Sequence, residues 1–276
     1  MIVKEYQRLE YGPGEGGISD PNGLSIWLET YMTRSPSAIR KLVVAYLQGN
    51  VITNCFDMLR AEHDADGDVI LDWFVSELRR FPINDLVGEL KESCYALSEC
   101  IDNIPQLSSL EGSTLGIVDV LSISETPLTY VRLGYQLYAS GNMRNETAKR
   151  KYGENAAKFA AILDLVRLGY DIKDPSAPNR IAVELTRMGM AVARAQGDKM
   201  EIIARLLLRS ALFRDLVCSE SESHERVFWS TVSLLSPATR LRRTSAFSAM
   251  LNVFKRYGGL LSDNCRAEEL LCRMRR

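Results

Sequence analysis

Hydrophobic residues in the first half of the chain recur three or four positions apart, which is the spacing of one helix face. Ile39, Val43 and Tyr46 show it after Ser35-Pro36, a pair typical of a helix N-cap followed by proline at the first helical position. Phe81-Pro82 and Ile104-Pro105 interrupt the pattern, because proline cannot continue a helix. Beyond the helix starting at Pro36, the pattern predicts helices over Val51–Arg60, Val69–Arg80 and Leu86–Ile101.

A different order of elements is predicted for residues 141–195, after a helix that ends near Tyr138. The pattern indicates a short helix, a tight turn, a long helix, a β-hairpin and a closing helix. That order is typical of a winged helix, which places its second helix in the DNA major groove. Winged helices also serve as protein-docking modules. The expected parts are Glu146–Tyr152, a turn at Gly153, Glu154–Leu168 closed by Gly169-Tyr170, strands over Tyr170–Ile172 and Ile181–Leu185, and a helix from Thr186.

These patterns predict a mainly α protein with a small β-hairpin wing. We expect an acidic helical N-terminal domain over residues 1–112, a winged helix-turn-helix domain over 113–197 and a C-terminal helical module over 198–276. The chain has no run of about 18 apolar residues, so we expect no membrane span. Its first residues lack the apolar core of a signal peptide, which favours a cytoplasmic location.

Charge divides the chain into two halves of opposite sign. The whole chain is nearly neutral, with 34 Lys and Arg against 35 Asp and Glu. Residues 141–276 hold 24 basic and 15 acidic residues, whereas residues 1–140 hold 10 and 20. Such asymmetry indicates a basic binding module joined to an acidic module with another task, although it also arises without a function.

Candidate DNA contacts lie on the predicted second helix and the wing. Asn155 and Lys158 are three residues apart and share a helix face, where base-edge contacts are made. Basic residues around them suit phosphate binding, which carries no sequence specificity. The alternative is a solvated lysine face on a structural helix. The candidates are Lys149, Arg150, Lys151, Asn155, Lys158, Lys173 and Arg180.

A second candidate is the helix predicted to begin at Ser236-Pro237. A helix N-terminus favours phosphate through its free amides and its dipole. Arginines and hydroxyls concentrated in the first two turns make an anion site there. The alternative is that these arginines pair with the acidic N-terminal half. The residues are Arg240, Arg242, Arg243, Thr244 and Ser245.

Short motifs follow one another through both segments. They are the run from Tyr152–Asn155 to Leu165-Val166, then Glu184–Gly189, Leu212-Phe213 and Thr239-x-x-Arg242-Arg243-Thr244-Ser245. Together they resemble a C-terminal module of restriction and anti-phage defence proteins, in which a winged helix precedes a helical part with a Thr-x-x-Arg-Arg-x-Ser/Thr signature. The resemblance covers about residues 125–258 and implies DNA binding, but nothing about the N-terminal half. This chain departs from the family at Met250 and Phe254, where tryptophans are usual.

An enzymatic alternative depends on Glu89-Leu90-Lys91, which has the Glu-x-Lys spacing of PD-(D/E)xK nucleases with Asp72 or Asp68 upstream. Its apolar neighbours are spaced as in a helix, which is the wrong geometry for that class. The six cysteines form no Cys-x-x-Cys pair and fit a reduced cytosolic protein. We therefore expect no metal and no cofactor.

The sequence therefore predicts a non-catalytic protein that binds duplex DNA, within a bacterial defence or regulatory complex. The acidic half would contact a protein partner or a second copy of the chain, or rest against the basic half when DNA is absent. The alternative is a scaffold or adaptor subunit that uses the winged helix for docking.

Overall fold

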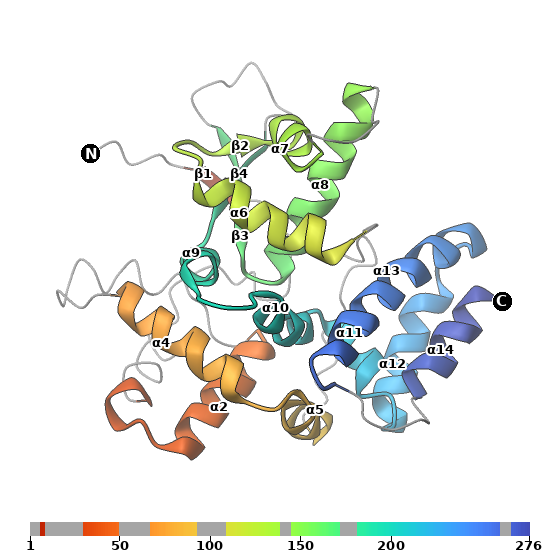
Figure 1. Cartoon of the computed structure of the whole chain (residues 1–276). Coiled ribbons are helices and arrows are strands. Elements are labelled where there is room, and N and C mark those ends of the chain that lie inside the picture. The colour runs from red at the N-terminus through yellow and green to blue at the C-terminus, as the bar shows by residue number, and fades with distance from the viewer. Residues whose placement is uncertain are drawn as a thin grey trace.

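The computed structural model describes residues 6–8, 30–49, 67–92, 109–138, 145–171, 181–259 and 266–276. In these parts the chain is mainly helical with one small antiparallel sheet, as the sequence predicts at this level. Figure 1 shows the sheet with α6, α7 and α8 in an upper lobe, the N-terminal helices at the lower left and α11–α14 at the right. Helices α9 and α10 lie between these groups (Figure 1).

The acidic part contains the helices α2 (Pro36–Leu47), α4 (Gly67–Arg80) and α5 (Ile83–Glu92). Ser35 is the N-cap of α2 and Pro36 its first residue, as predicted. The break at Phe81-Pro82 separates α4 from α5. The helix predicted over Val51–Arg60 and the second half of Leu86–Ile101 lie outside the described residues.

Residues 109–194 supply most of the sheet and the helices around it. In chain order they form a π-helical turn (Glu111–Leu115), α6 (Gly116–Ser122), β2 (Leu128–Thr129), α7 (Tyr130–Leu137), α8 (Glu146–Ile162), β3 (Val166–Asp171), β4 (Ile181–Leu185) and α9 (Arg187–Arg194). Together with β1 (Tyr6–Arg8) the strands lie in the order β1-β3-β4-β2, and all pairs are antiparallel. In the β3–β4 hairpin, Leu168 lies opposite Val183.

The turn predicted at Gly153 is wrong, because α8 runs through this residue as one helix. Gly153 is buried against α7, and a Cβ atom there would overlap the carbonyl oxygen of Tyr130. Likewise, a Cβ at Gly134 of α7 would overlap the carbonyl oxygen of Lys149. The glycines therefore permit a close crossing of two helices. The tight helix pair consists of α7 and α8, not of Glu146–Tyr152 and Glu154–Leu168.

The predicted end of this helix at Leu168 is also wrong, because α8 ends at Ile162. Asp164 adopts a positive φ of 60°, which turns the chain out of the helix. The amide of Thr186 then donates to the carbonyl of Leu165, at the start of the strand pair. Val166 to Leu168 belong to β3. The sequence did not distinguish the two structures here, because a short apolar run fits a buried strand as well as a helix.

The C-terminal part is entirely helical in the described residues. It contains α10 (Met200–Leu206), a 3₁₀ turn (Leu207–Arg209), α11 (Ala211–Val217), α12 (Glu222–Ser233), α13 (Pro237–Arg256) and α14 (Arg266–Arg275). The start of α13 agrees with the prediction, because the Ser236 hydroxyl accepts a hydrogen bond from the amide of Thr239.

Buried residues from all three predicted units form one hydrophobic cluster that extends from Ile39 to Met274. The division at residues 112 and 197 stays a prediction. No helix of the described ranges is long and apolar enough to cross a membrane.

Ion pairs join the acidic N-terminal helices to the basic part of the chain. On α4, Asp68 lies 3.1 Å from Arg187 of α9, and Asp72 lies 2.7 Å from Arg194. Lys91 of α5 pairs with Glu220. Part of the opposite charge of the two halves is therefore neutralised within the molecule.

Candidate nucleic-acid interface

The outer face of α8 carries a polar stripe that begins at the helix N-terminus. The Asn145 side chain caps this end by accepting a hydrogen bond from the amide of Ala148 at 2.7 Å. Thr147, Arg150 and Lys151 are exposed. One to two turns further on, Glu154, Asn155 and Lys158 are half-buried, while the opposite face packs into the core through Ala156, Ala157, Phe159 and Ala160.

Lys149 lies beside this stripe, but its ammonium group contacts α7. The Nζ atom lies 3.8 Å from the centroid of the Tyr135 ring, a cation–π contact on an exposed tyrosine. Near the middle of α8, the ring of Tyr152 meets the ring of Tyr138 edge-on with centroids 4.5 Å apart. Arg150 and Lys151 are therefore the most accessible predicted cations of α8.

Glu154 holds the centre of the stripe and pairs with two of the predicted DNA-binding lysines. Its carboxylate lies 3.3 Å from Lys151 and 2.8 Å from Lys158, one turn before and one turn after it. Burial raises the pKa of Glu154, but the hydrogen bonds and positive charges of Lys158 and Lys151 outweigh burial and lower that pKa overall. The carboxylate therefore stays ionised at neutral pH and offsets positive charge on the stripe. The sequence analysis missed this role, although the spacing 151, 154, 158 contains the signal.

The described part of the β3–β4 hairpin carries an ion pair on its surface. Lys173 and Arg180, the two predicted wing contacts, lie outside the described residues. Arg167 of β3 is exposed, and it pairs with Glu184 across the hairpin.

The predicted contacts of α13 lie away from the start of α8, and the two helix N-termini stand apart in Figure 1. Arg242 and Ser245 are exposed, whereas Arg240 and Arg243 are half-buried. Thr244 is buried, and its hydroxyl donates to the carbonyl of Arg240 at 2.8 Å. Thr244 therefore cannot contact a phosphate, because its side chain is buried and its hydroxyl donates to its own helix.

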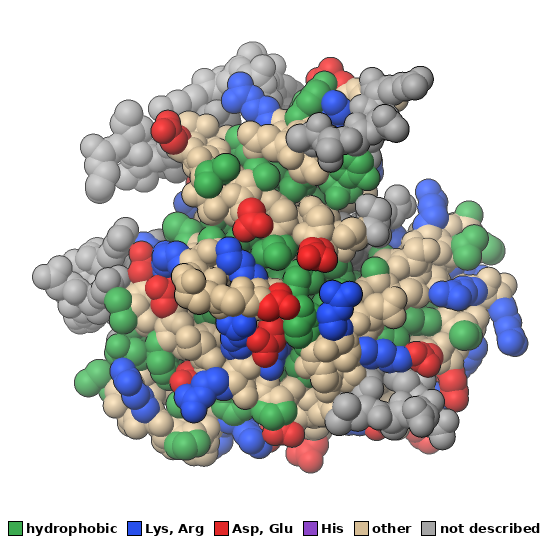
Figure 2. Space-filling model, in the orientation of Figure 1, with side chains coloured by type: hydrophobic (Ala, Val, Ile, Leu, Met, Phe, Trp, Pro, Cys, Tyr) green, Lys and Arg blue, Asp and Glu red, His purple; other side chains and the backbone are tan. Residues whose placement is uncertain are grey.

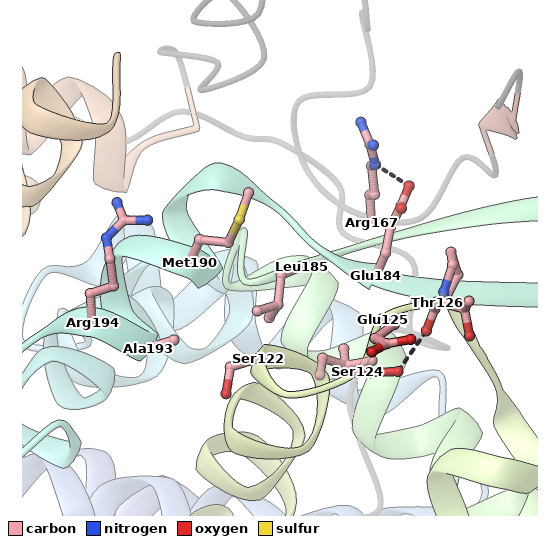
Figure 3. A pocket seen from close by; sticks show the side chains of 12 residues that line it. Ser122, Ser124, Glu125, Thr126, Arg167, Glu184, Leu185, Met190, Ala193 and Arg194 are labelled. Carbon is pink, nitrogen blue, oxygen red and sulfur yellow. Dashed lines mark hydrogen bonds and ion pairs between the residues drawn. The ribbon is translucent and has the colours of Figure 1, made fainter. Parts of the chain in front are cut away.

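An open groove of about 430 Å³ lies between α6, the start of β2, β4 and α9 (Figure 3). Leu185 and Met190 lie between its charged ends, with Arg167 and Glu184 on one side and Arg194 on the other (Figure 3). Most of the charged side chains are already engaged, since Arg167 pairs with Glu184 and Arg194 pairs with Asp72, whereas Glu125 is the remaining charged residue of the lining. Ser122 and Ser124 donate to nearby backbone carbonyls. The groove therefore offers a small ligand few uncommitted polar groups.

The catalytic alternatives find no support in the described residues. The nuclease arrangement is wrong because Glu89 and Lys91 lie on helix α5, where Glu89 pairs with Arg40 and Lys91 with Glu220. No group of three or more metal-binding side chains occurs in the parts of the chain that the structure describes.

Another set of catalytic residue types lies around α11, where His224 Nδ1 is 2.7 Å from Asp215 Oδ1. Cys218, in the same part of the chain, has its thiol against the carbonyl of Val87. All three side chains are buried, which leaves a substrate no access to them. We interpret the His224–Asp215 pair as structural.

Comparisons with protein-family models, with curated proteins and with solved structures find no match for this chain. The resemblance to defence proteins stays a prediction from the sequence. Any assignment of function depends on the geometry of α8, the sheet and α13.

Proposed function

We propose that the chain binds duplex DNA without catalysis, and that α6, β2, α7, α8 and the β3–β4 hairpin form a winged helix with α8 as the recognition helix. The observation that carries the proposal is the order of these elements. A helix, a short strand, two closely crossed helices and a hairpin follow one another, and β2 pairs with β4 of the hairpin. Recognition helices enter the major groove by their N-terminal residues. The exposed cations Arg150 and Lys151 lie in that half of α8.

The partners of the predicted contact residues also favour DNA binding over a role in joining the two halves of the chain. Lys151 pairs with Glu154 of its own helix, and the Arg242 guanidinium donates to the carbonyl of Ala238 on its own helix. By contrast, the cations that pair with α4 are Arg187 and Arg194, which were not predicted to contact DNA.

A direct test compares wild-type protein with the double variant Arg150→Ala/Lys151→Ala. We expect low-salt binding of a fluorescently labelled random-sequence duplex, measured by anisotropy, to weaken steeply as salt rises. The slope of log K against log[salt] should be shallower by about 2 in the double variant, since each lost phosphate contact removes about 0.9.

The matched control is Arg80→Ala, which removes an exposed cation from α4 in the acidic half. This variant should bind like the wild type. Absence of binding at low salt, or equal slopes for the wild type and the double variant, would overturn the proposal.

A second test replaces Glu154 and should strengthen DNA binding instead of weakening it. We expect Glu154→Gln to bind a random-sequence duplex more tightly by about tenfold at low salt, because it removes a negative charge from the stripe and releases the exposed Lys151 for phosphate. The same anisotropy titration measures the change. Glu77→Gln, which removes an acid paired with Arg80 on α4, should leave the affinity unchanged. Equal or weaker binding by Glu154→Gln would contradict a phosphate-facing stripe on α8.

The rival function is that of a scaffold or adaptor subunit that docks proteins through the same elements. The internal neutralisation of Lys151 and Lys158 by Glu154 favours it, because a partly neutral face suits a protein partner. A protein partner for the acidic half and a place in a bacterial defence complex both remain predictions from the sequence.

A further inference from the structure

The helix pair α13 and α14 carries its acidic residues at one end, while basic residues occur along its whole length. They run antiparallel, since Lys255 near the end of α13 pairs with Glu268 near the start of α14, and Arg275 near the end of α14 donates to Ser248 in the middle of α13. The last turn of α14 therefore lies beside the middle of α13, and α14 ends pointing toward the N-terminal part of α13. The arginines on this side are Arg240, Arg242 and Arg243 of α13, Arg273 and Arg275 of α14, and Arg276, which directly follows α14.

The acidic residues of this helix pair lie at the opposite end. α13 contains no Asp or Glu, and those of α14 are Glu268 and Glu269 in its first turn. They are engaged there by Lys255 and Arg266. Glu225 of α12 bridges the two ends of α14, since it lies 3.0 Å from Arg266 and 2.9 Å from Arg273, whose guanidinium also covers the Trp229 ring. Arg242, Arg275 and Arg276 remain exposed.

We propose that this arginine end, defined as the exposed Arg242, Arg275 and Arg276 with the adjoining N-terminus of α13, is a second phosphate-binding surface that holds a nucleic-acid backbone without reading its sequence. Arginine suits this ligand, because its planar fork donates two parallel hydrogen bonds to phosphate oxygens. The dipole of α13, a helix of 20 residues, favours an anion beside its first turn, and the exposed Ser245 adds a hydroxyl about two turns further along.

The arginine end and α8 lie in different lobes of the molecule. Figure 2 shows Lys and Arg side chains gathered over the α12–α14 lobe at the right, whereas α8 belongs to the upper lobe. A duplex long enough to reach both lobes would gain phosphate contacts that a short duplex on α8 cannot make. The proposal extends the proposed DNA binding to a second surface, but its residues and its test are independent of α8.

The test uses the triple variant Arg242→Ala/Arg275→Ala/Arg276→Ala in the full chain, with anisotropy titrations of random duplexes of about 12 and about 40 base pairs over a salt series. We expect the salt slope on the long duplex to fall by about 2 to 3, since each phosphate contact contributes about 0.9. We expect little change on the short duplex. The matched control is Lys255→Ala, which removes a cation of the same helix pair that is already engaged by Glu268 and should leave both slopes unchanged.

The two proposals fail in different ways. If the triple variant matches the wild type on both duplexes while Arg150→Ala/Lys151→Ala loses binding, the arginine end is overturned and α8 stands. If the triple variant loses binding to the long duplex and the α8 variant does not, the arginine end stands and the recognition role of α8 is overturned.

A third outcome concerns anionic lipid, since Leu234 and Leu241 are exposed on the same lobe. Binding to phosphatidylserine vesicles that the triple variant loses, with duplex binding unchanged, would overturn the nucleic-acid assignment.

Discussion

Replacing Gly153 by alanine should lower the free energy of unfolding by about 3 kcal/mol, at the upper end of the usual cost of overpacking a core. The added Cβ would overlap the carbonyl oxygen of Tyr130 and crowd the amide of Gly134. Both are backbone atoms of α7, so no side chain can rotate away to make room. Urea unfolding followed by far-UV circular dichroism measures the change.

Gly88→Ala is the matched control for this substitution. Gly88 lies inside α5 on an exposed position, and a Cβ there meets nothing within 4 Å. Alanine at this position should raise the free energy of unfolding by about 0.5–1 kcal/mol, because it removes the backbone entropy cost of a helical glycine. Equal effects of the two substitutions would show that α7 and α8 do not cross as closely as the structure describes.

Gly153 also illustrates where sequence reasoning fails. A glycine between two helical patterns predicts a turn, because glycine is costly inside a helix. In the structure the cost is offset by the approach of α7, which requires a position without a side chain. The need is created by Tyr130 and Gly134, which lie on the preceding helix, so no local pattern around Gly153 could reveal it.

Helices with clear periodicity and capping were predictable from the sequence. Ser35-Pro36 and Ser236-Pro237 mark the starts of α2 and α13, since capping and proline act locally. The end of α8 was not predictable, because it depends on Asp164, a non-glycine residue with positive φ. That conformation is held by long-range contacts, including the hydrogen bond that Tyr46 donates to the Asp164 carboxylate at 2.9 Å.

The sequence also predicts part of the candidate site, namely the part that depends on spacing within one helix. The face shared by Asn155 and Lys158 follows from helical spacing, and so does the pairing of Glu154 with the lysines on either side. The placement of Arg275 and Arg276 on the side of the helix pair that faces the N-terminal part of α13 needed the antiparallel packing of α14 on α13, which sequence periodicity does not give. Long-range packing therefore decides which of the basic residues act together.

Buried arginines join the N-terminal helices to the rest of the molecule. Arg214 donates to the carbonyl of Leu47 at the end of α2, and Arg205 donates to the carbonyl of Phe81 after α4. Burial lowers the pKa of Arg205, although the neighbouring Glu201 acts in the opposite direction. Arg209 lies between these two along the chain and donates to the carbonyl of Tyr46. The last residues of these helices are thereby fixed to the segment that enters the C-terminal module.

Arg209→Ala should lower the free energy of unfolding by about 3–5 kcal/mol, comparable to losing a large buried side chain or one partner of a buried charged contact. Arg209 is 6% exposed, and its guanidinium carbon lies 4.2 Å from the centroid of the Tyr46 ring. Alanine would remove this cation–π contact and leave a cavity beside the fully buried Tyr46. The loss would reach the turn after α8 as well, because the Tyr46 hydroxyl holds Asp164 there.

Tyr46→Phe separates the hydrogen bond from the packing in this cluster. Burial raises the pKa of Tyr46, with a further contribution from the charge of Asp164, so its hydroxyl stays protonated and donates at neutral pH. Phenylalanine removes that one hydrogen bond and should cost about 1–3 kcal/mol, clearly less than Arg209→Ala. Urea titrations of both variants, followed by circular dichroism, give the comparison. If Arg209→Ala unfolds at the wild-type urea concentration, Arg209 is not a structural link between α2 and the C-terminal module.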